Sequence, residues 1–294
     1  MDAVDVVVVS FNSEGTLRAC LEPLVGLAGV TVILVDSDSQ DRSVESVSDL
    51  PIRIERLPQN NGFAYACNRG WKLGNASLVL FLNPDATIDP RSLELLAGVA
   101  RDPWVGAAAP KVLEADGSLD FSMRRFPRLR TTYAQALFLH RLFPQAEWSD
   151  ELVRDPTAYT KASSPEWVSG ACVLLKRDVL DRLGGFDEGF FLYCEDIDLC
   201  RRVRDAGFEI RFEPGAVAIH SGGASAPRAQ LLPVLAASRI RYARKHRSRL
   251  VAVLERGGVV LGAVTHAPVA RGGRAARRGH VRAVVQALRP GSNL

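Results

Sequence analysis

The chain has 294 residues, of which 47% are apolar and 24% charged, and a net charge of +4; this balance excludes a largely disordered chain and suits one large α/β domain or two smaller ones. Its five cysteines are odd in number and form no Cys-x-x-Cys pair, which argues against a disulfide framework or a zinc ribbon and favours a reducing compartment. The first five residues lack the basic start of a signal peptide, and no uncharged apolar stretch reaches the roughly 20 residues of a membrane span, so we expect a cytoplasmic protein.

Strand and helix patterns alternate along the first third of the chain. Continuous apolar runs predict buried strands, and apolar residues at helical spacing predict helices. In chain order we expect strands over 4–10, 30–35, 52–57 and 78–82, and helices over 16–27, 43–48, 62–73 and 90–101. This alternation is typical of a mostly parallel sheet with helices on both faces.

The remainder of the chain is less regular. We expect strands over 105–113, 167–176, 208–212 and 216–219, and helices over 177–183, 196–206 and 226–254. Residues 117–161 are interpreted as a loop-rich insertion with a short helix near 133–143. The sequence therefore predicts an α/β domain over 1–225 and a basic, mainly helical extension over 226–294.

Polar clusters directly follow three of the predicted strands. They are Ser10-Phe11-Asn12, Asp36-Ser37-Asp38 and Asn83-Pro84-Asp85. In a mostly parallel sheet, ligands bind beyond the carboxyl ends of the strands, so three clusters in this register predict a binding site. The Asp85 carboxylate suits a hard divalent cation, which would neutralise a diphosphate leaving group. The alternative is that Asp85 only shapes a proline turn.

Two further segments carry groups suited to catalysis. The aromatic run Phe190-Phe191-Leu192-Tyr193 leads into the adjacent carboxylates of Glu195 and Asp196 at a predicted helix start. An acid beside an apolar wall suits a general base, and the alternative is ordinary helix capping. His220 ends the last predicted strand, where a neutral imidazole could bind a divalent metal; the alternative is an ordinary polar residue.

A nucleotide could be held by a third group of residues. Asp36, Asp38 and Asp41, with Asn60-Asn61-Gly62, offer acceptors for a base and a ribose, and the alternative is a loop rich in turn formers. The sequence has no GxGxxG after a strand and no GxxxxGK followed by Ser or Thr, which disfavours a dinucleotide oxidoreductase and a P-loop ATPase. A GxSxG elbow is also absent.

The C-terminal tail is strongly basic. From Ser238 to Leu294 there are 13 Lys or Arg residues and one acid, Glu255, so the tail carries +12 and the rest of the chain −8. This asymmetry predicts an anionic partner, and the alternative is a solvated helix that binds nothing. Because Tyr242 is the tail's single aromatic residue, we expect no nucleic acid but a peripheral contact with the inner face of the cell membrane.

These clusters, in this order, resemble the family 2 glycosyltransferases, and most closely the bacterial rhamnosyltransferase-like branch. The resemblance runs from about Val4 to about Ser225. Its most specific part comprises Trp167-Val168-Ser169-Gly170-Ala171, Gly184-Gly185-Phe186-Asp187-Glu188, Glu195-Asp196-Ile197-Asp198-Leu199 and Arg202. It implies the GT-A fold, a mostly parallel mixed sheet flanked by helices.

The resemblance also implies roles for individual residues. Asp196 would deprotonate the acceptor hydroxyl, Glu195 would help to position the acceptor, and His220 would join Asp85 in binding Mg²⁺ or Mn²⁺. The donor-binding residues would be Ser10, Asn12, Asp36, Asn60, Gly62, Asn68, Asn83 and Asp85, and the acceptor side would include Trp167 and Gly170. Two positions depart from the family pattern: Asn83 replaces the first aspartate of the DxD motif, and Ser37 replaces the usual asparagine.

The predicted function is therefore an inverting, metal-dependent sugar transfer by a single displacement. We expect rhamnose to move from dTDP-rhamnose to a glycan or lipid-linked acceptor in cell-wall or surface polysaccharide synthesis. The alternatives are a transferase that uses a UDP-hexose or a UDP-N-acetylhexosamine, and a non-catalytic module that binds a nucleotide or glycan.

Overall fold

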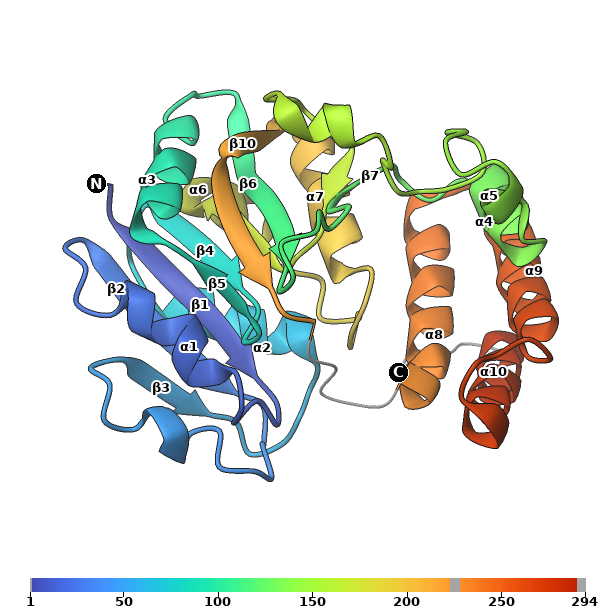
Figure 1. Ribbon diagram of the computed structural model, residues 1–294, viewed down its shortest axis with the longest axis horizontal. Coiled ribbons are helices and arrows are strands. Elements are labelled where there is room, and N and C mark those ends of the chain that lie inside the picture. The colour runs from blue at the N-terminus through green and yellow to red at the C-terminus, as the bar shows by residue number, and fades with distance from the viewer. Residues whose placement is uncertain (1, 223–227, 290–294) are drawn as a thin grey trace. The chain divides into compact units, whose positions relative to one another are not determined.

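The computed structural model describes residues 2–222 and 228–289, and the chain divides into two compact units, whose elements are labelled in Figure 1. Unit 1 consists of 1–124, 155–187 and 196–225, and unit 2 of 125–154, 188–195 and 226–294. The predicted domain boundary at Ser225 lies outside the described residues. Two inner segments that the sequence placed in the α/β domain, 125–154 and 188–195, belong to unit 2.

Unit 1 is built on a mixed, mostly parallel sheet. Within the described residues the sheet has eight strands in the order β3-β2-β1-β4-β9-β6-β10-β5. These are β1 (Val4–Ser10), β2 (Val30–Asp36), β3 (Arg53–Arg56), β4 (Leu78–Leu82), β5 (Ala86–Ile88), β6 (Val105–Glu114), β9 (Cys172–Lys176) and β10 (Glu209–His220). All seven residues of β1 are buried, as its continuous β-branched run predicted.

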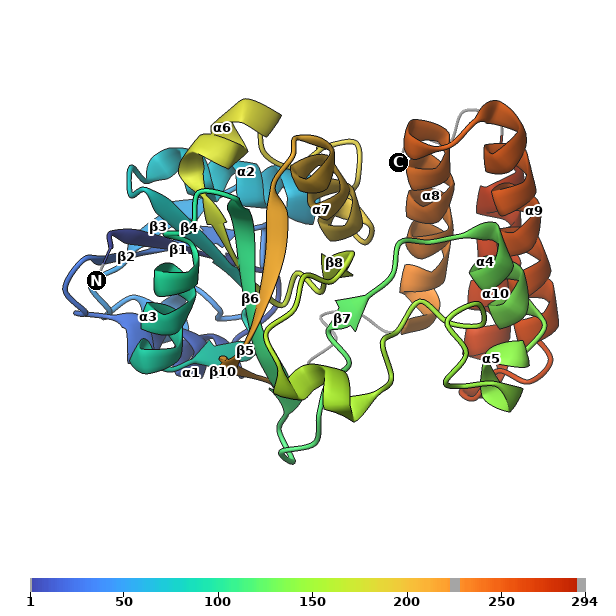
Figure 2. The same cartoon turned by 90° about the horizontal axis from the view of Figure 1, so that it is seen from above.

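Helices cover both faces of this sheet (Figure 2). Unit 1 contains α1 (Leu17–Leu21), α2 (Phe63–Leu73), α3 (Pro90–Val99), α6 (Arg177–Leu183) and, except for its first residue, α7 (Glu195–Asp205). It also has 3₁₀ turns over Glu22–Leu24, Glu45–Val47 and Pro156–Thr160. Alternate residues of β1 face opposite layers: Val6 and Val8 share a core cluster with α1 and α3, whereas a Cβ at Gly70 of α2 would meet Val7. Gly70 thus lets α2 lie close against β1.

Several elements of unit 1 differ from the sequence prediction. The helix expected over 16–27 is the short helix α1 followed by a 3₁₀ turn, and the helix expected over 43–48 is only the 3₁₀ turn Glu45–Val47. The segment 167–176 is two strands, β8 (Trp167–Val168) and β9, interrupted at Ser169-Gly170-Ala171; β8 pairs with β7 (Met123–Arg124) in a separate two-stranded sheet. The two short strands expected over 208–219 are a single strand, β10, with a register shift between Glu213 and Val217. Strand β5 was not predicted, because three residues are too few to show a periodicity.

Unit 2 is helical. It contains α4 (Leu129–Ala136), α5 (Leu139–Leu142), α8 (Arg228–His246), α9 (Arg249–His266) and α10 (Gly273–Leu288). The predicted helix over 226–254 begins outside the described residues and is divided at Ser248, whose hydroxyl accepts a hydrogen bond from Val251 N and caps α9. Among the residues that the structure describes, no helix is both long and apolar enough to cross a bilayer.

A buried charge network joins the inserted segment 125–154 to α8 and α9. Arg239 Nη1 donates to Glu151 Oε2 over 3.1 Å, and Arg239 Nη2 lies 3.7 Å from Glu255 Oε1. Thr132 in α4 also donates to the Glu255 carboxylate. Because a buried cation needs acidic partners, this network explains why 125–154 packs with the C-terminal helices.

Candidate active site

The sheet brings Asp85 and His220 together in unit 1. Asp85 lies in the turn between β4 and β5, and the antiparallel pairing of β5 with β10 places Ala86 opposite His220. Ser221 N donates to the Asp85 carbonyl over 2.9 Å. As a result, Asp85 Oδ1 lies 3.2 Å from His220 Nε2, so the two residues predicted to bind a metal are neighbours.

Asp120 is a site residue that the sequence did not predict. Its Oδ2 lies 3.9 Å from His220 Nδ1, on the opposite side of the ring from Asp85. The carboxylates of Asp120 and Asp85, one on each side of the imidazole, favour its protonated form and raise the pKa of His220 to about 10. A second carboxylate on the free nitrogen of a metal-binding histidine fixes the orientation of the ring. Because Asp120 follows β6 in a turn without a local motif, only its tertiary position identifies it.

The Asp85 and His220 pair fits a divalent cation. Asp85 Oδ1 and His220 Nε2, 3.2 Å apart, would hold the cation together once His220 gives up the proton that its two carboxylate neighbours favour. In the described ranges 2–222 and 228–289, no group of three or more His, Cys, Asp or Glu side chains is arranged to hold a metal. Two protein ligands leave the other positions to substrate phosphates and water, as is usual for Mg²⁺.

The second part of the site is centred on Asp196. It is the second residue of α7 and half-buried, with Oδ2 accepting from Gly170 N over 3.2 Å and Oδ1 accepting from Ile197 N over 2.8 Å. Burial raises the pKa of Asp196, and its backbone donors and the charge of Arg124 partly oppose this rise. A carboxylate of raised pKa is suited to accept a proton near neutral pH.

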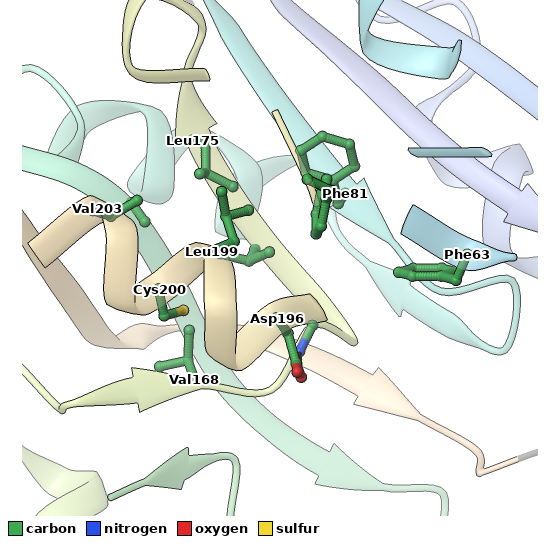
Figure 3. A pocket seen from close by; sticks show the side chains of 12 residues that line it. Phe63, Phe81, Val168, Leu175, Asp196, Leu199, Cys200 and Val203 are labelled. Carbon is green, nitrogen blue, oxygen red and sulfur yellow. Dashed lines mark hydrogen bonds between the residues drawn. The ribbon is translucent and has the colours of Figure 1, made fainter. Parts of the chain in front are cut away.

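Apolar side chains lie beside the Asp196 side chain on its inner side (Figure 3). Asp196 is the one acid among the residues that line a cavity of about 10 Å³, together with Val168, Leu199 and Phe81. A cavity of that size holds about one water molecule, so it is too small to bind a substrate. The apolar residues that line it help to bury Asp196, and this desolvation raises the pKa of its carboxyl group.

The residues before Asp196 have an uncommon backbone conformation. Tyr193 and Cys194 both lie in the left-handed region, with φ of 68° and 64°. Such conformations cost about 1–3 kcal/mol each in residues other than glycine and concentrate at functional sites. Glu195 follows them, is 6% exposed and belongs to unit 2, and its role in positioning the acceptor stays a prediction.

Of the two predicted acceptor-side residues, Gly170 contacts Asp196. Gly170 donates its N–H to the carboxylate, and a Cβ at Gly170 would lie 3.3 Å from Asp196 Cβ. Trp167, three residues earlier, is 4% exposed and packs beneath the guanidinium of Arg124. A side chain at position 170 would therefore crowd Asp196, which glycine avoids. The Trp167 ring supports the guanidinium of Arg124.

The loops after β1 and β2 are tied together on the predicted donor side. Asp36 is 5% exposed, and its Oδ1 accepts from Ser10 Oγ over 2.7 Å and from Ser39 Oγ over 2.6 Å. Asn12, exposed and left-handed with φ of 53°, accepts from Gln40 N over 2.8 Å. Ser10 thus positions Asp36 inside the fold, while Asn12 lies at the surface of the same loop pair.

The remaining donor-side residues surround the start of α2 and the end of β4. Asn60 Oδ1 accepts from Gly62 N over 2.9 Å, and Gly62 has a φ of 95° that favours glycine. Asn83 is half-buried; its N–H donates to Ala171 O over 2.9 Å. Asn60, Gly62 and Asn83 therefore shape turns at strand and helix ends, and their donor contacts stay predictions.

Asn68, also predicted to bind the donor, has a structural role in the fold. Its side chain is 2% exposed. The amide donates to Phe186 O over 2.9 Å and accepts from Phe186 N over 2.9 Å and Trp71 Nε1 over 3.1 Å. Because the amide is buried and bound at both ends, it joins α2 to the chain after α6, and its predicted contact with the donor stays a prediction.

Comparison with known proteins adds to this geometry. A family model described as Glycosyl transferase family 2 matches residues 5–184. The N-acetylglucosaminyl-diphospho-decaprenol L-rhamnosyltransferase of Mycobacterium tuberculosis is 31% identical over 236 residues, which cover 74% of this chain and 76% of that protein. Rhamnosyltransferase WbbL of Escherichia coli strain K12 is 28% identical over 167 residues, covering 55% and 59%.

Solved structures show the same fold at low sequence identity. The mannosyltransferase PcManGT from Pyrobaculum calidifontis, in complex with GDP-Man and Mn²⁺, superposes with a TM-score of 0.58 at 16% identity and covers 97% of this chain and 86% of its own. Residues 1–349 of S. aureus TarS give a TM-score of 0.52 at 16% identity, covering 92% and 73%. Unit 1 thus has the predicted GT-A arrangement of a curled, mostly parallel sheet between helices.

Proposed function

This chain belongs to glycosyl transferase family 2, and from that premise we propose that it transfers rhamnose from dTDP-rhamnose to a lipid-linked diphosphate sugar in cell-wall or surface polysaccharide synthesis. The observation that carries the proposal is the half-buried Asp196, held by Gly170 N, in the same unit as the Asp85 and His220 pair. The choice of sugar and acceptor is supported by the M. tuberculosis relative, which is named for both.

The reaction would proceed as a single displacement. Asp196 accepts the proton of the acceptor hydroxyl while that oxygen forms its bond to the anomeric carbon. The bond from the anomeric carbon to the diphosphate oxygen breaks, and its electron pair leaves with the nucleoside diphosphate. Because the hydroxyl attacks from the face opposite the leaving group, the anomeric configuration inverts.

Asp85 and His220 would hold Mg²⁺ or Mn²⁺ against the donor. When bound, the cation supplies charge that stabilises the departing diphosphate. Asp120 would keep the His220 ring in its binding orientation through the other nitrogen. Ser10 would hold Asp36 ready to meet the nucleotide base.

One face of α10 supports the proposed contact with an anionic membrane. A shallow groove on it is lined by Arg274, Arg277, Arg278, Val281 and Arg282, and α10 contains no acidic residue. Val281, Val285 and Leu288 are 58%, 49% and 62% exposed. Arginines beside exposed aliphatic side chains suit the headgroup region of an acidic bilayer, where each basic residue contributes about 1 kcal/mol.

The donor and its metal are tested by thermal shift with dTDP-rhamnose, UDP-glucose, UDP-N-acetylglucosamine and GDP-mannose, each with and without Mn²⁺. A ligand that binds only the folded state at about 100 times its Kd stabilises it by about 2.7 kcal/mol. The proposal expects a shift with dTDP-rhamnose that needs Mn²⁺ and disappears in Asp85→Ala. A shift with a UDP-sugar instead would establish the alternative donor class, and no shift with any donor would favour a non-catalytic module.

A further inference from the structure

Arg124 lies beside the acceptor side of the site without an assigned role. It is the last residue of β7, directly opposite Trp167 in β8. Residues opposite each other in an antiparallel pair project from the same face, and the Arg124 guanidinium carbon lies 5.3 Å from the centroid of the Trp167 ring. The strand pairing and the indole together fix where this guanidinium can lie.

One nitrogen of this guanidinium lacks a hydrogen-bond partner in the described part of the chain. Its Nε is buried and has no hydrogen-bond acceptor among residues 2–222 and 228–289. Arg177, in contrast, pairs with the buried carboxylate of Asp5. Because the Arg124 side chain is half-buried and its guanidinium is not fully hydrogen-bonded, its outer nitrogens are candidates to bind an anion supplied by a ligand.

Arg124 and Asp196 are held by the same short segment. Arg124 stacks on Trp167, and Asp196 accepts from Gly170 N. Three residues of extended chain span at most about 10 Å, so the cation and the carboxylate are fixed near each other. The charge of Arg124 is close enough to lower the pKa of Asp196 against the effect of burial.

The chemistry of the proposed acceptor explains a cation at this place. In N-acetylglucosaminyl-diphospho-decaprenol, the acceptor for which the M. tuberculosis relative is named, one sugar carries both the hydroxyls and the diphosphate. An anionic group must therefore lie within the width of one sugar ring of the general base. The donor diphosphate, in contrast, would be met by the cation at Asp85 and His220.

We infer that Arg124 binds a phosphate of the acceptor diphosphate, with Trp167 holding the guanidinium in place; this inference rests on the proposed function. A planar guanidinium can bind two phosphate oxygens at once, which a lysine cannot. The pair Arg124 and Trp167 would thus select acceptors that carry a diphosphate on the sugar that is to be extended.

The test compares two acceptors: N-acetylglucosamine on a short prenyl diphosphate, and a neutral alkyl glycoside of the same sugar. In Arg124→Ala, we expect the loss of kcat/KM with the diphosphate acceptor to exceed the loss with the glycoside by about 10- to 100-fold. Arg124→Lys should retain only part of the wild-type kcat/KM with the diphosphate acceptor. Neither variant should change the donor Kd. Arg101→Ala, which removes an exposed arginine paired with Asp2, is the matched control. It should leave kcat/KM unchanged with both acceptors.

Equal losses with both acceptors would overturn the inference, and so would a weaker donor Kd in Arg124→Ala. A second measurement separates this inference from the proposed function. Prenyl diphosphate without a sugar is titrated into the full-length Asp196→Asn protein, with and without Arg124→Ala. Arg124-dependent binding would support the subsite even if transfer of rhamnose failed, whereas binding that ignores Arg124 would refute it.

Discussion

Asp196→Asn should abolish most transfer without unfolding the protein. The substitution keeps the shape of the side chain but removes the proton acceptor, and loss of a general base costs about 100- to 10,000-fold in rate, or about 3 to 5 kcal/mol in activation free energy. Both carboxylate oxygens accept backbone N–H bonds, from Gly170 and Ile197. Since the asparagine NH₂ cannot accept, one bond is lost, at about 1 kcal/mol of unfolding free energy.

Asp198→Asn is the matched control, two residues further along α7. Asp198 is fully buried, and its Oδ2 accepts from Arg202 Nε over 2.8 Å. Breaking a buried ion pair costs about 3–5 kcal/mol, and the asparagine carbonyl can still accept from Arg202, so we expect about 3 kcal/mol. The two variants should therefore show opposite patterns: low activity with near-normal stability, and near-normal activity per folded molecule with low stability.

The assay measures kcat/KM for sugar transfer and the free energy of urea unfolding on the same preparations. Donor binding by thermal shift confirms that the Asp196→Asn site is intact. A residual rate above a tenth of the wild type in Asp196→Asn would refute the assignment of Asp196 as the base.

Further predictions concern other parts of the site and of the fold. Removal of divalent metal by EDTA should abolish donor-induced stabilisation, and Mn²⁺ should restore it in the wild type but not in Asp85→Ala; metal-independent stabilisation would contradict the cation site. Asn68→Ala should lower the unfolding free energy by about 2–4 kcal/mol, because the Phe186 N–H and C=O lose their partners, yet leave the donor Kd unchanged; a raised donor Kd in the folded variant would support its predicted contact with the donor. Replacing Arg274, Arg277, Arg278 and Arg282 by Gln should abolish co-sedimentation with phosphatidylglycerol vesicles, with phosphatidylcholine vesicles as the control; unchanged co-sedimentation would exclude α10 as the contact. The acidic limb of the pH–rate profile should move to higher pH in Arg124→Ala, since the Arg124 charge lowers the pKa of Asp196; an unmoved limb would show that Asp196 does not control it.

The sequence alone determined the elements whose signal is local. The β-branched run of β1, the apolar runs of β2 and β4 and the helical spacing of α2 and α3 each predict an element with nearly the observed bounds. Hydrophobic periodicity is a property of neighbouring residues, so it can be recognised before the fold is known. The GT-A fold and the sugar-transferase class were implied by the resemblance of short sequence motifs to the family 2 glycosyltransferases.

Tertiary structure decided which distant residues meet. The pairing of β5 with β10 places His220 beside Asp85, and a turn after β6 adds Asp120. The pairing of β7 with β8 stacks Arg124 on Trp167. No spacing rule predicts such contacts, because they depend on strand order and register, which are set by the packing of the whole sheet.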